Sequence, residues 1–208
     1  MSYKVIPLFA TPLYRSSIPD IDVLTYKKLI SFEWEHNEGF VTHTETAERH
    51  LLDRPEFAGL KKALQQKVDE YVYNVLGVQT DLSWPITTSW VNRSKPNDYH
   101  TQHWHSNSMV SGVFYIDTNP NSGAILFHKE RNHKNLWSDQ IAINFTSEND
   151  YNTEAVGILP NKNEVLLFPS VLNHSVLENT SNKDRYSLAF NVFPKGVLGK
   201  GGNSELTV

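Results

Sequence analysis

Histidines are concentrated in one short stretch of the chain, and their spacing is typical of metal ligands. Five of the nine histidines lie between His100 and His133, and three of those five fall in YHTQHWHSNS. His103 and His105 are two residues apart, so on a β-strand their side chains would project to the same face. A third nitrogen ligand would come from a distant strand, and His174 in FPSVLNHSVLEN is the candidate. The pattern predicts a site in which His103, His105 and His174 bind a metal, although paired histidines also occur on solvent-facing strands.

A second pattern follows eleven residues after His174. Arg185 and Ser187, in RYSLAFNV, stand two apart and would share one face of a strand. A guanidinium can bind a carboxylate through two parallel hydrogen bonds, and a neighbouring hydroxyl can add a third. The alternative is a surface arginine that opens a strand. The chain thus combines two ligands on one strand, a distant third histidine, and a candidate carboxylate-binding pair.

The elements that must position these residues are mostly strands. Between Leu82 and Pro194 the chain is a succession of short β-rich runs separated by turn residues, and aromatic residues, which favour sheets, make up 12% of the sequence. The runs are ITTSWVN, SMVSGVFYI, GAILFH, QIAINF, EAVGIL, EVLLFP, HSVLEN and RYSLAFNVF. Such a series predicts a mainly β protein, with a jelly roll or another antiparallel double sheet. Helical periodicity predicts two preceding helices, packed on one outer sheet face. One runs over residues 22–36 and includes Trp34, and the other is capped by Asp53 and stops at Gly77.

Length and composition fit a single domain. We expect a helical N-terminal part over residues 1–80, a β core over 81–194 and a tail over 195–208. The chain has no cysteine, which excludes disulfides and thiolate metal sites. Its net charge of −4 argues against strong binding of nucleic acid through bulk charge. With no signal peptide and no apolar run long enough to span a membrane, we expect a cytoplasmic protein.

Four segments together resemble the bacterial and phage family of 2-oxoglutarate–Fe(II) oxygenases. They are LFATPLY near the N-terminus, HWHSNSMVSGVFYI over residues 103–116, GAILFH, and LLFPSVLNHSVLENTSNKDRYSLAFNV. The resemblance implies a double-stranded β-helix with Fe(II) and 2-oxoglutarate as cofactors. It also implies a dioxygenase that hydroxylates a substrate, not identified by the sequence, and releases succinate and carbon dioxide.

One position departs from the wider superfamily, whose iron is bound by two histidines and one carboxylate in an H-x-D/E pattern. The residue two positions after His103 is His105. His105 could be the third ligand, it could point away and leave the place to water or halide, or a carboxylate such as Asp98 or Glu130 could reach the metal. We favour the first reading, because imidazole is a good ferrous ligand. Three neutral imidazoles would leave the double charge of Fe(II) uncompensated, which suits a dianion, and nearby carboxylates could accept the ring N–H groups.

Two further residues are candidates for binding the co-substrate. Asn92, just before the histidine cluster, could hydrogen-bond the keto-acid end of 2-oxoglutarate, or it could cap a turn. Tyr115 alternates with Phe114 along one strand, so one of the two faces the interior, where a tyrosine hydroxyl could meet the co-substrate carboxylate. With Arg185 and Ser187, these residues form the expected 2-oxoglutarate site.

Two other classes of protein remain open at this stage. One is a cupin-type three-histidine metalloprotein that does not use 2-oxoglutarate, and the other is a non-catalytic metal-binding module. For the oxygenase we expect O2 and a small-molecule or peptide substrate as partners, no membrane and no strong nucleic-acid binding, with a homodimer as an option. Anaerobic titration with Fe(II) and 2-oxoglutarate would separate the three classes.

Overall fold

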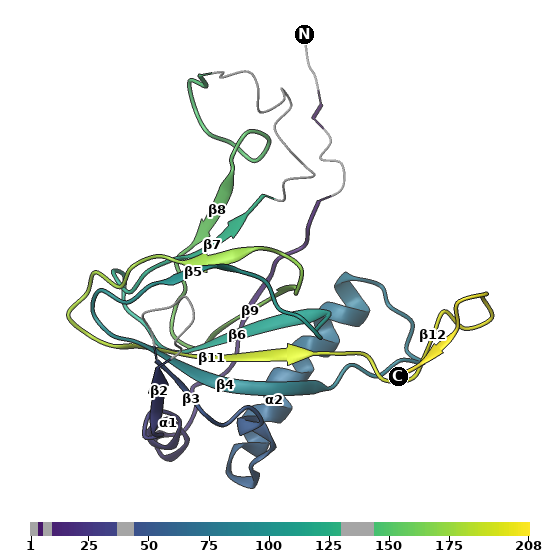
Figure 1. Ribbon diagram of the computed structural model, residues 1–208, viewed down its shortest axis with the longest axis horizontal. Coiled ribbons are helices and arrows are strands. Elements are labelled where there is room, and N and C mark those ends of the chain that lie inside the picture. The colour runs from purple at the N-terminus through teal and green to yellow at the C-terminus, as the bar shows by residue number, and fades with distance from the viewer. Residues whose placement is uncertain (1–3, 6–9, 37–43, 130–143) are drawn as a thin grey trace.

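The computed structural model describes residues 4–5, 10–36, 44–129 and 144–208, and within them two antiparallel sheets form the centre of the fold (Figure 1). The larger sheet has seven strands, in the order β1 (Tyr14–Ser17), β9 (Glu164–Pro169), β6 (Val110–Asp117), β11 (Arg185–Val192), β4 (Ile86–Ser94), β3 (Thr44–Thr46) and β2 (Trp34–His36). The smaller sheet has four strands, in the order β5 (His100–His103), β10 (His174–Val176), β7 (Ile125–His128) and β8 (Ala155–Ile158).

The mainly β prediction is confirmed, and the two antiparallel sheets are consistent with a jelly roll. Seven of the expected β-rich runs each contain a strand, namely β4, β6, β7, β8, β9, β10 and β11. The remaining run, QIAINF, begins at residues 140–143, which lie outside the described residues.

Successive residues on the central strands of the larger sheet belong to two different hydrophobic cores. Phe114 and Tyr115 are neighbours on β6, yet Phe114 belongs to the larger hydrophobic cluster and Tyr115 to the smaller one. Leu166 and Leu167 on β9 divide in the same way, because successive strand residues point to opposite faces. One face of the sheet therefore meets the helical layer, and the other meets the four-stranded sheet.

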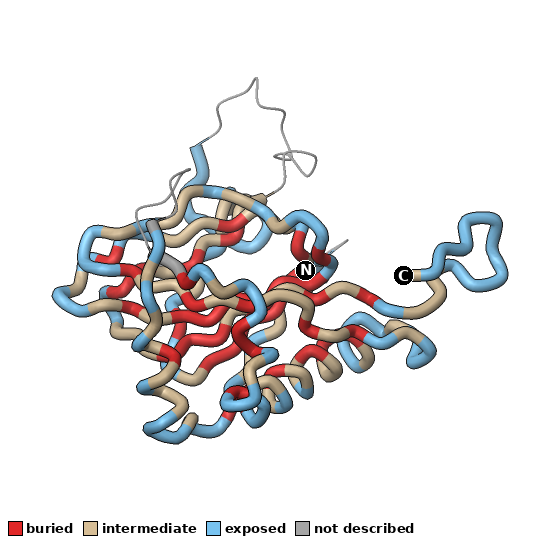
Figure 2. Tube along the Cα trace, turned by 60° about the horizontal axis from the view of Figure 1, so that its bottom comes forward, coloured by how far each residue is buried: buried red, intermediate tan, exposed pale blue. Residues whose placement is uncertain are grey.

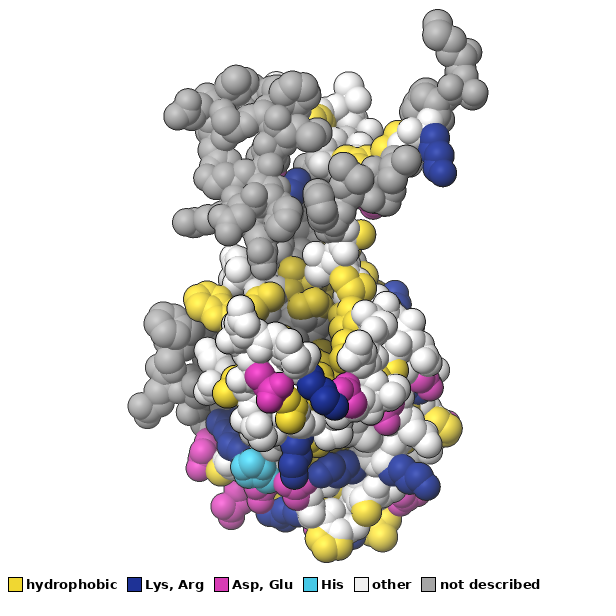
Figure 3. All heavy atoms as spheres, turned by 90° about the vertical axis from the view of Figure 1, so that its right-hand side faces the viewer, with side chains coloured by type: hydrophobic (Ala, Val, Ile, Leu, Met, Phe, Trp, Pro, Cys, Tyr) yellow, Lys and Arg dark blue, Asp and Glu magenta, His cyan; other side chains and the backbone are white. Residues whose placement is uncertain are grey.

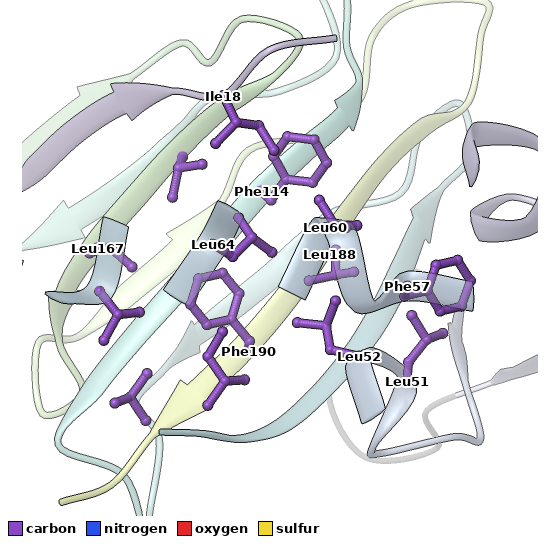
Figure 4. Packing of buried hydrophobic residues seen from close by; sticks show 14 of the residues in the cluster. Ile18, Leu51, Leu52, Phe57, Leu60, Leu64, Phe114, Leu167, Leu188 and Phe190 are labelled. Carbon is purple, nitrogen blue, oxygen red and sulfur yellow. The ribbon is translucent and has the colours of Figure 1, made fainter. Parts of the chain in front are cut away.

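The helical layer comes from the N-terminal part of the chain. Its elements are α1 (Val23–Leu29), the 3₁₀ turns η1 (Leu51–Asp53) and η2 (Pro55–Phe57), α2 (Ala58–Asp69) and the π-helical turn η3 (Glu70–Val75). Leu60 and Leu64 of α2 share the larger cluster with Leu188 and Phe190 of β11, and Figure 4 shows them over this face of the sheet. Gly77, with φ of 69°, follows the end of the helical segment.

Two details of the predicted helices are wrong. The first helix ends at Leu29, and Trp34–His36 forms β2, where the Trp34 ring packs 5.8 Å from that of Tyr186. This tertiary contact outweighs the local helical periodicity. Asp53 does not cap the second helix: it lies in a 3₁₀ turn and binds Lys61, while α2 starts only at Ala58. The part expected to be helical, residues 1–80, thus also supplies three strands.

The last residues form a small hairpin of β12 (Val197–Leu198) and β13 (Leu206–Thr207), where an arm or frayed end was expected. Figure 2 shows buried segments running through the centre of the molecule, with this hairpin outside them. Among the described residues no helix has the length and apolar character needed to cross a membrane.

Candidate metal and co-substrate site

The three predicted metal ligands lie together at the facing ends of two strands. His103 ends β5 and His174 begins β10, and the two residues are register partners in the antiparallel pair. His105 lies two residues beyond β5, where its backbone N–H donates to the Ser170 carbonyl at 3.0 Å. One ring nitrogen from each histidine lies within 4.8 Å of the other two. Strand pairing and one loop hydrogen bond therefore bring the three rings to one point.

The rings of His103 and His174 are oriented by local backbone. Each Nδ1 lies 2.9 Å from the carbonyl oxygen two residues earlier, at Thr101 and Leu172 respectively. A carbonyl only accepts, so each Nδ1 carries the hydrogen and each Nε2 keeps its lone pair for a metal. Burial, with a smaller contribution from His103, lowers the pKa of His174 to about 3, which keeps this ring neutral.

The ring of His105 is oriented by side chains. Its Nδ1 lies 2.6 Å from Asn191 Oδ1 and 3.0 Å from Ser111 Oγ. The expectation that carboxylates would accept the ring N–H groups is therefore wrong for the contacts that the structure gives, because backbone carbonyls and an amide take that place. Asp98, one of the alternative ligands, instead accepts the Lys95 N–H at 2.8 Å and does not line the cavity, and Glu130 lies outside the described residues.

All seven residues expected at the site line one cavity of about 430 Å³. They are His103, His105, His174, Asn92, Tyr115, Arg185 and Ser187. Asn92, Ser187 and Tyr115 form a row across β4, β11 and β6, because Ser187 is the register partner of both other residues. Arg185 lies in the next row, opposite Ser94.

Arg185 is a buried cation with unused donors. Only 4% of its surface is exposed, and burial lowers the pKa of its guanidinium. Nη1 donates to the carbonyls of Ser122 and Gly123 at 3.3 and 3.1 Å, and Nη2 donates to Ser94 Oγ at 3.3 Å. Nε has no partner among the described residues. Because a guanidinium has five N–H groups, Nε–H and one Nη2–H remain available along one edge.

The row next to Arg185, formed by Asn92, Ser187 and Tyr115, also offers hydrogen-bonding groups. Burial raises the pKa of Tyr115 to about 12, so its phenol stays protonated and can donate. Asn92 Oδ1 accepts from Trp90 Nε1 at 3.1 Å. Ser187 is 3% exposed and lies between these two residues in the register.

Sequence reasoning missed three polar residues that contact the candidate ligands. Asn191 continues the period of two that begins with Arg185 and Ser187, so alternation along β11 could have found it. Ser111 was not recognised as a partner of His105, because that contact crosses from β6 to the loop after β5. His100 stacks on His103 with ring centroids 3.9 Å apart, and it too lines the cavity.

The fold is similar to that of several solved proteins. An oxidoreductase of the 2OG-Fe(II) oxygenase family from Burkholderia pseudomallei superimposes with a TM-score of 0.56 and 13% identity, covering 86% of this chain and 83% of that one. A prolyl-4-hydroxylase from Pseudomonas putida has a TM-score of 0.56 and 14% identity, and the match covers 89% of this chain and 94% of that one. HygX from Streptomyces hygroscopicus, solved with nickel and 2-oxoglutarate bound, has a TM-score of 0.54 and 16% identity, and the match covers 88% of this chain and 82% of that one. At these identities the likeness establishes the fold alone, which is that of 2-oxoglutarate oxygenases.

The sequence then identifies the family. Residues 88–191 match the family described as "Putative 2OG-Fe(II) oxygenase", and the chain belongs to this family. A search of curated proteins gave no match. The protein is therefore a dioxygenase that depends on Fe(II) and 2-oxoglutarate, as the sequence motifs indicated. The matched segment begins within β4 and ends within β11, so it includes all seven expected site residues.

Proposed function

We propose that His103, His105 and His174 bind the Fe(II) of this oxygenase. The observation that carries the proposal is the set of three rings whose Nδ1 atoms each lie next to an acceptor, with one nitrogen of each ring within 4.8 Å of the others. The remaining Nε2 atoms are neutral nitrogen donors of the kind that ferrous iron accepts. The donor set therefore fits the metal that the family uses.

The 2-oxoglutarate site is assigned to the row of polar residues beside the triad. Arg185 pairs through its free Nε–Nη2 edge with the distal carboxylate, and Ser187 and Tyr115 donate to the same carboxylate. Asn92 is placed to hydrogen-bond the keto-acid end. The assignment rests on a buried cation with two unused donors and on the absence of any Asp or Glu among the described residues that line the cavity.

The overall reaction is assigned as hydroxylation of a small-molecule or peptide substrate. The three histidines would hold Fe(II), and the polar residues beside them would hold 2-oxoglutarate. Together the two cofactors would supply the oxidising chemistry, with O2 as the oxidant and succinate and carbon dioxide as co-products. We assign the reaction to a single cytoplasmic domain, with a homodimer compatible with it. Figure 3 shows acidic and basic side chains mixed on one face of the molecule, in keeping with weak nucleic-acid binding.

The test of the metal assignment is anaerobic Fe(II) binding followed by addition of 2-oxoglutarate. The wild type should bind one Fe(II) and develop a visible charge-transfer band only when both are present. His174→Ala should lose this binding. The matched control is His128→Ala on β7, because His128 bonds Ser175 Oγ at 2.8 Å and does not line the cavity.

Two results would contradict the assignment. Equal Fe(II) binding by His174→Ala and His128→Ala would refute the assignment of the three histidines as the metal site. A wild type that binds Fe(II) but gives no response to 2-oxoglutarate would favour a cupin-type metalloprotein, in which the buried Arg185 has no counterpart to bind.

A further inference from the structure

The three candidate ligands are not held in the same way, and His105 is the exception. His103 and His174 each bond a backbone carbonyl two residues earlier, which a substitution cannot remove. His105 instead donates from Nδ1 to Asn191 Oδ1 at 2.6 Å, across 86 positions of the chain. Its orientation therefore depends on a side chain of β11.

The amide of Asn191 is itself held in one orientation. Its Nδ2 donates to Thr88 Oγ1 on the neighbouring strand β4 at 3.1 Å, which directs Oδ1 toward His105. An amide oxygen only accepts hydrogen bonds, so the hydrogen of the His105 ring belongs on Nδ1. The reverse orientation would donate to Nδ1 and place the hydrogen on Nε2, where it would block a metal.

A series of three buried serine hydroxyls also requires the hydrogen of the His105 ring to be on Nδ1. Ser108 Oγ donates to the Val110 carbonyl at 3.0 Å, and Ser170 Oγ donates to Ser108 Oγ at 2.7 Å. Ser111 Oγ lies 2.9 Å from Ser170 Oγ and 3.0 Å from His105 Nδ1. Each hydroxyl has one hydrogen, and Ser170 has used its own on Ser108. Ser111 has two acceptors for its hydrogen, Ser170 Oγ and Asn191 Oδ1 at 3.3 Å, and with either of them it offers His105 a lone pair. Ser111, at the end of this series of hydroxyls, thus accepts the hydrogen bond that His105 Nδ1 donates.

We propose that Asn191 and Ser111 are positioning residues, which hold His105 as a neutral ligand with Nε2 toward the metal. The inference rests on the proposed function, since it assigns the residues that orient one of the three proposed ligands. Both partners are uncharged. A carboxylate in the place of Asn191 would add negative charge to the ring, whereas the amide orients it and leaves the charge of the bound iron uncompensated.

The position of His105 explains why such support is needed. His105 follows the end of β5, so strand pairing does not fix its backbone as it does for His103 and His174. Removal of the partner that orients a ligating histidine typically lowers metal affinity by about 10- to 100-fold. We expect a loss in that range when the acceptor at position 191 is removed.

The experiment measures metal affinity without substrate, by competition with a chromophoric chelator under anaerobic conditions. Asn191→Leu keeps the size of the side chain but removes the acceptor, and it should weaken Fe(II) binding by about 10- to 100-fold. Asn191→Asp keeps an acceptor, so Fe(II) binding should stay at or above the wild-type level while the Fe(III)/Fe(II) potential falls. Asn119→Leu is the matched control, because Asn119 donates to Ser181 Oγ at 3.1 Å and does not line the cavity.

A double-mutant cycle separates positioning from a general structural effect. Ni(II), which binds imidazole more tightly than Fe(II) does, keeps binding measurable when one ligand is missing. In the His105→Ala background, Asn191→Leu should have no further effect on Ni(II) affinity, because the ring that it orients is absent. Circular dichroism and thermal unfolding of the metal-free variants show which of them fold, and Ser111→Ala replaces Asn191→Leu if the latter does not.

The outcomes distinguish this inference from the proposed function. If the wild type does not bind Fe(II), the proposed metal site is refuted. A wild type that binds Fe(II) normally, with Asn191→Leu within twofold of it, would overturn the positioning role alone. So would an equal loss from Asn191→Leu with and without His105, or an Asn191→Asp variant as weak as Asn191→Leu.

Discussion

Replacement of Arg185 by alanine should strongly weaken 2-oxoglutarate binding while leaving metal binding in place. The guanidinium is 4% exposed, and three of its five N–H groups already bond Ser94, Ser122 and Gly123. Nε has no partner among the described residues, and Arg185 has no carboxylate within salt-bridge distance among them. The ligand that completes this group is therefore an anion with two parallel acceptors, which describes a carboxylate.

The size of the effect follows from these contacts. Each hydrogen bond to a charged group contributes about 1.5–3 kcal/mol, and two are lost with Arg185. Water that enters the enlarged cavity will solvate part of the stranded carboxylate, which brings the expected loss to about 2–5 kcal/mol. That range corresponds to roughly a 30- to 5,000-fold increase in the dissociation constant of 2-oxoglutarate.

The effect on the free energy of unfolding should be smaller than the effect on binding. Loss of the guanidinium leaves the Ser122 and Gly123 carbonyls without a donor, at a cost of about 1–3 kcal/mol. It also removes a buried charge that has no counter-ion among the described residues, which is favourable by a similar amount. The two terms oppose each other, so the metal-free variant should unfold near the wild-type temperature.

The assay is anaerobic calorimetric titration of 2-oxoglutarate into protein loaded with Fe(II) or Ni(II). Arg93→Ala is the matched control, since Arg93 also lies on a central strand but pairs with Asp184 at 2.7 Å. Arg185→Lys keeps the charge but loses the planar edge, and it should recover only part of the affinity. Unchanged 2-oxoglutarate affinity in Arg185→Ala, with a marked fall in unfolding temperature, would refute the reasoning and make Arg185 a structural residue.

Three further results are expected. His105→Ala should weaken Fe(II) binding in chelator competition, whereas tight binding with only a spectral change would mean that two histidines suffice. Ser187→Ala should weaken 2-oxoglutarate binding by about 1.5–3 kcal/mol in the same titration as above, with Fe(II) affinity unchanged; equal 2-oxoglutarate affinities would exclude a direct contact. Gly112→Ala should lower the free energy of unfolding by about 1–3 kcal/mol in denaturant titration, because the added Cβ would lie 2.1 Å from the Phe190 ring; unchanged stability would show that the ring can move.

The sequence predicted the residues whose placement depends on short-range alternation. Arg185 and Ser187 share a face because both lie within β11, and the strand character of RYSLAFNVF was evident from its composition. The resemblance implied the double-stranded β-helix to which this strand belongs, and the structure brings all seven expected residues to one cavity. Alternation along single strands and the family motifs together were sufficient to predict these seven residues.

The contacts that escaped prediction depend on register between distant strands. The Asn191–His105 bond requires β11 to lie beside β6 and the loop after β5 to return over both. No local signal encodes these distances. Trp34 shows the same limit, since its place on β2 depends on Tyr186, which lies far away in the sequence.

The charges of the cavity favour the co-substrate that we propose for it. Three histidines, an amide and a protonated tyrosine contribute no negative charge, and no Asp or Glu among the described residues lines the cavity. Arg185 adds a buried positive charge, which costs stability when it is unpaired. With Fe(II) at the proposed triad, the cavity would carry positive charge at the metal and at the buried Arg185, while Arg49, an exposed residue of the lining, adds a third charge. A dicarboxylate whose two ends reach the metal and Arg185 would neutralise both of them, and a monoanion would leave one of the two uncompensated.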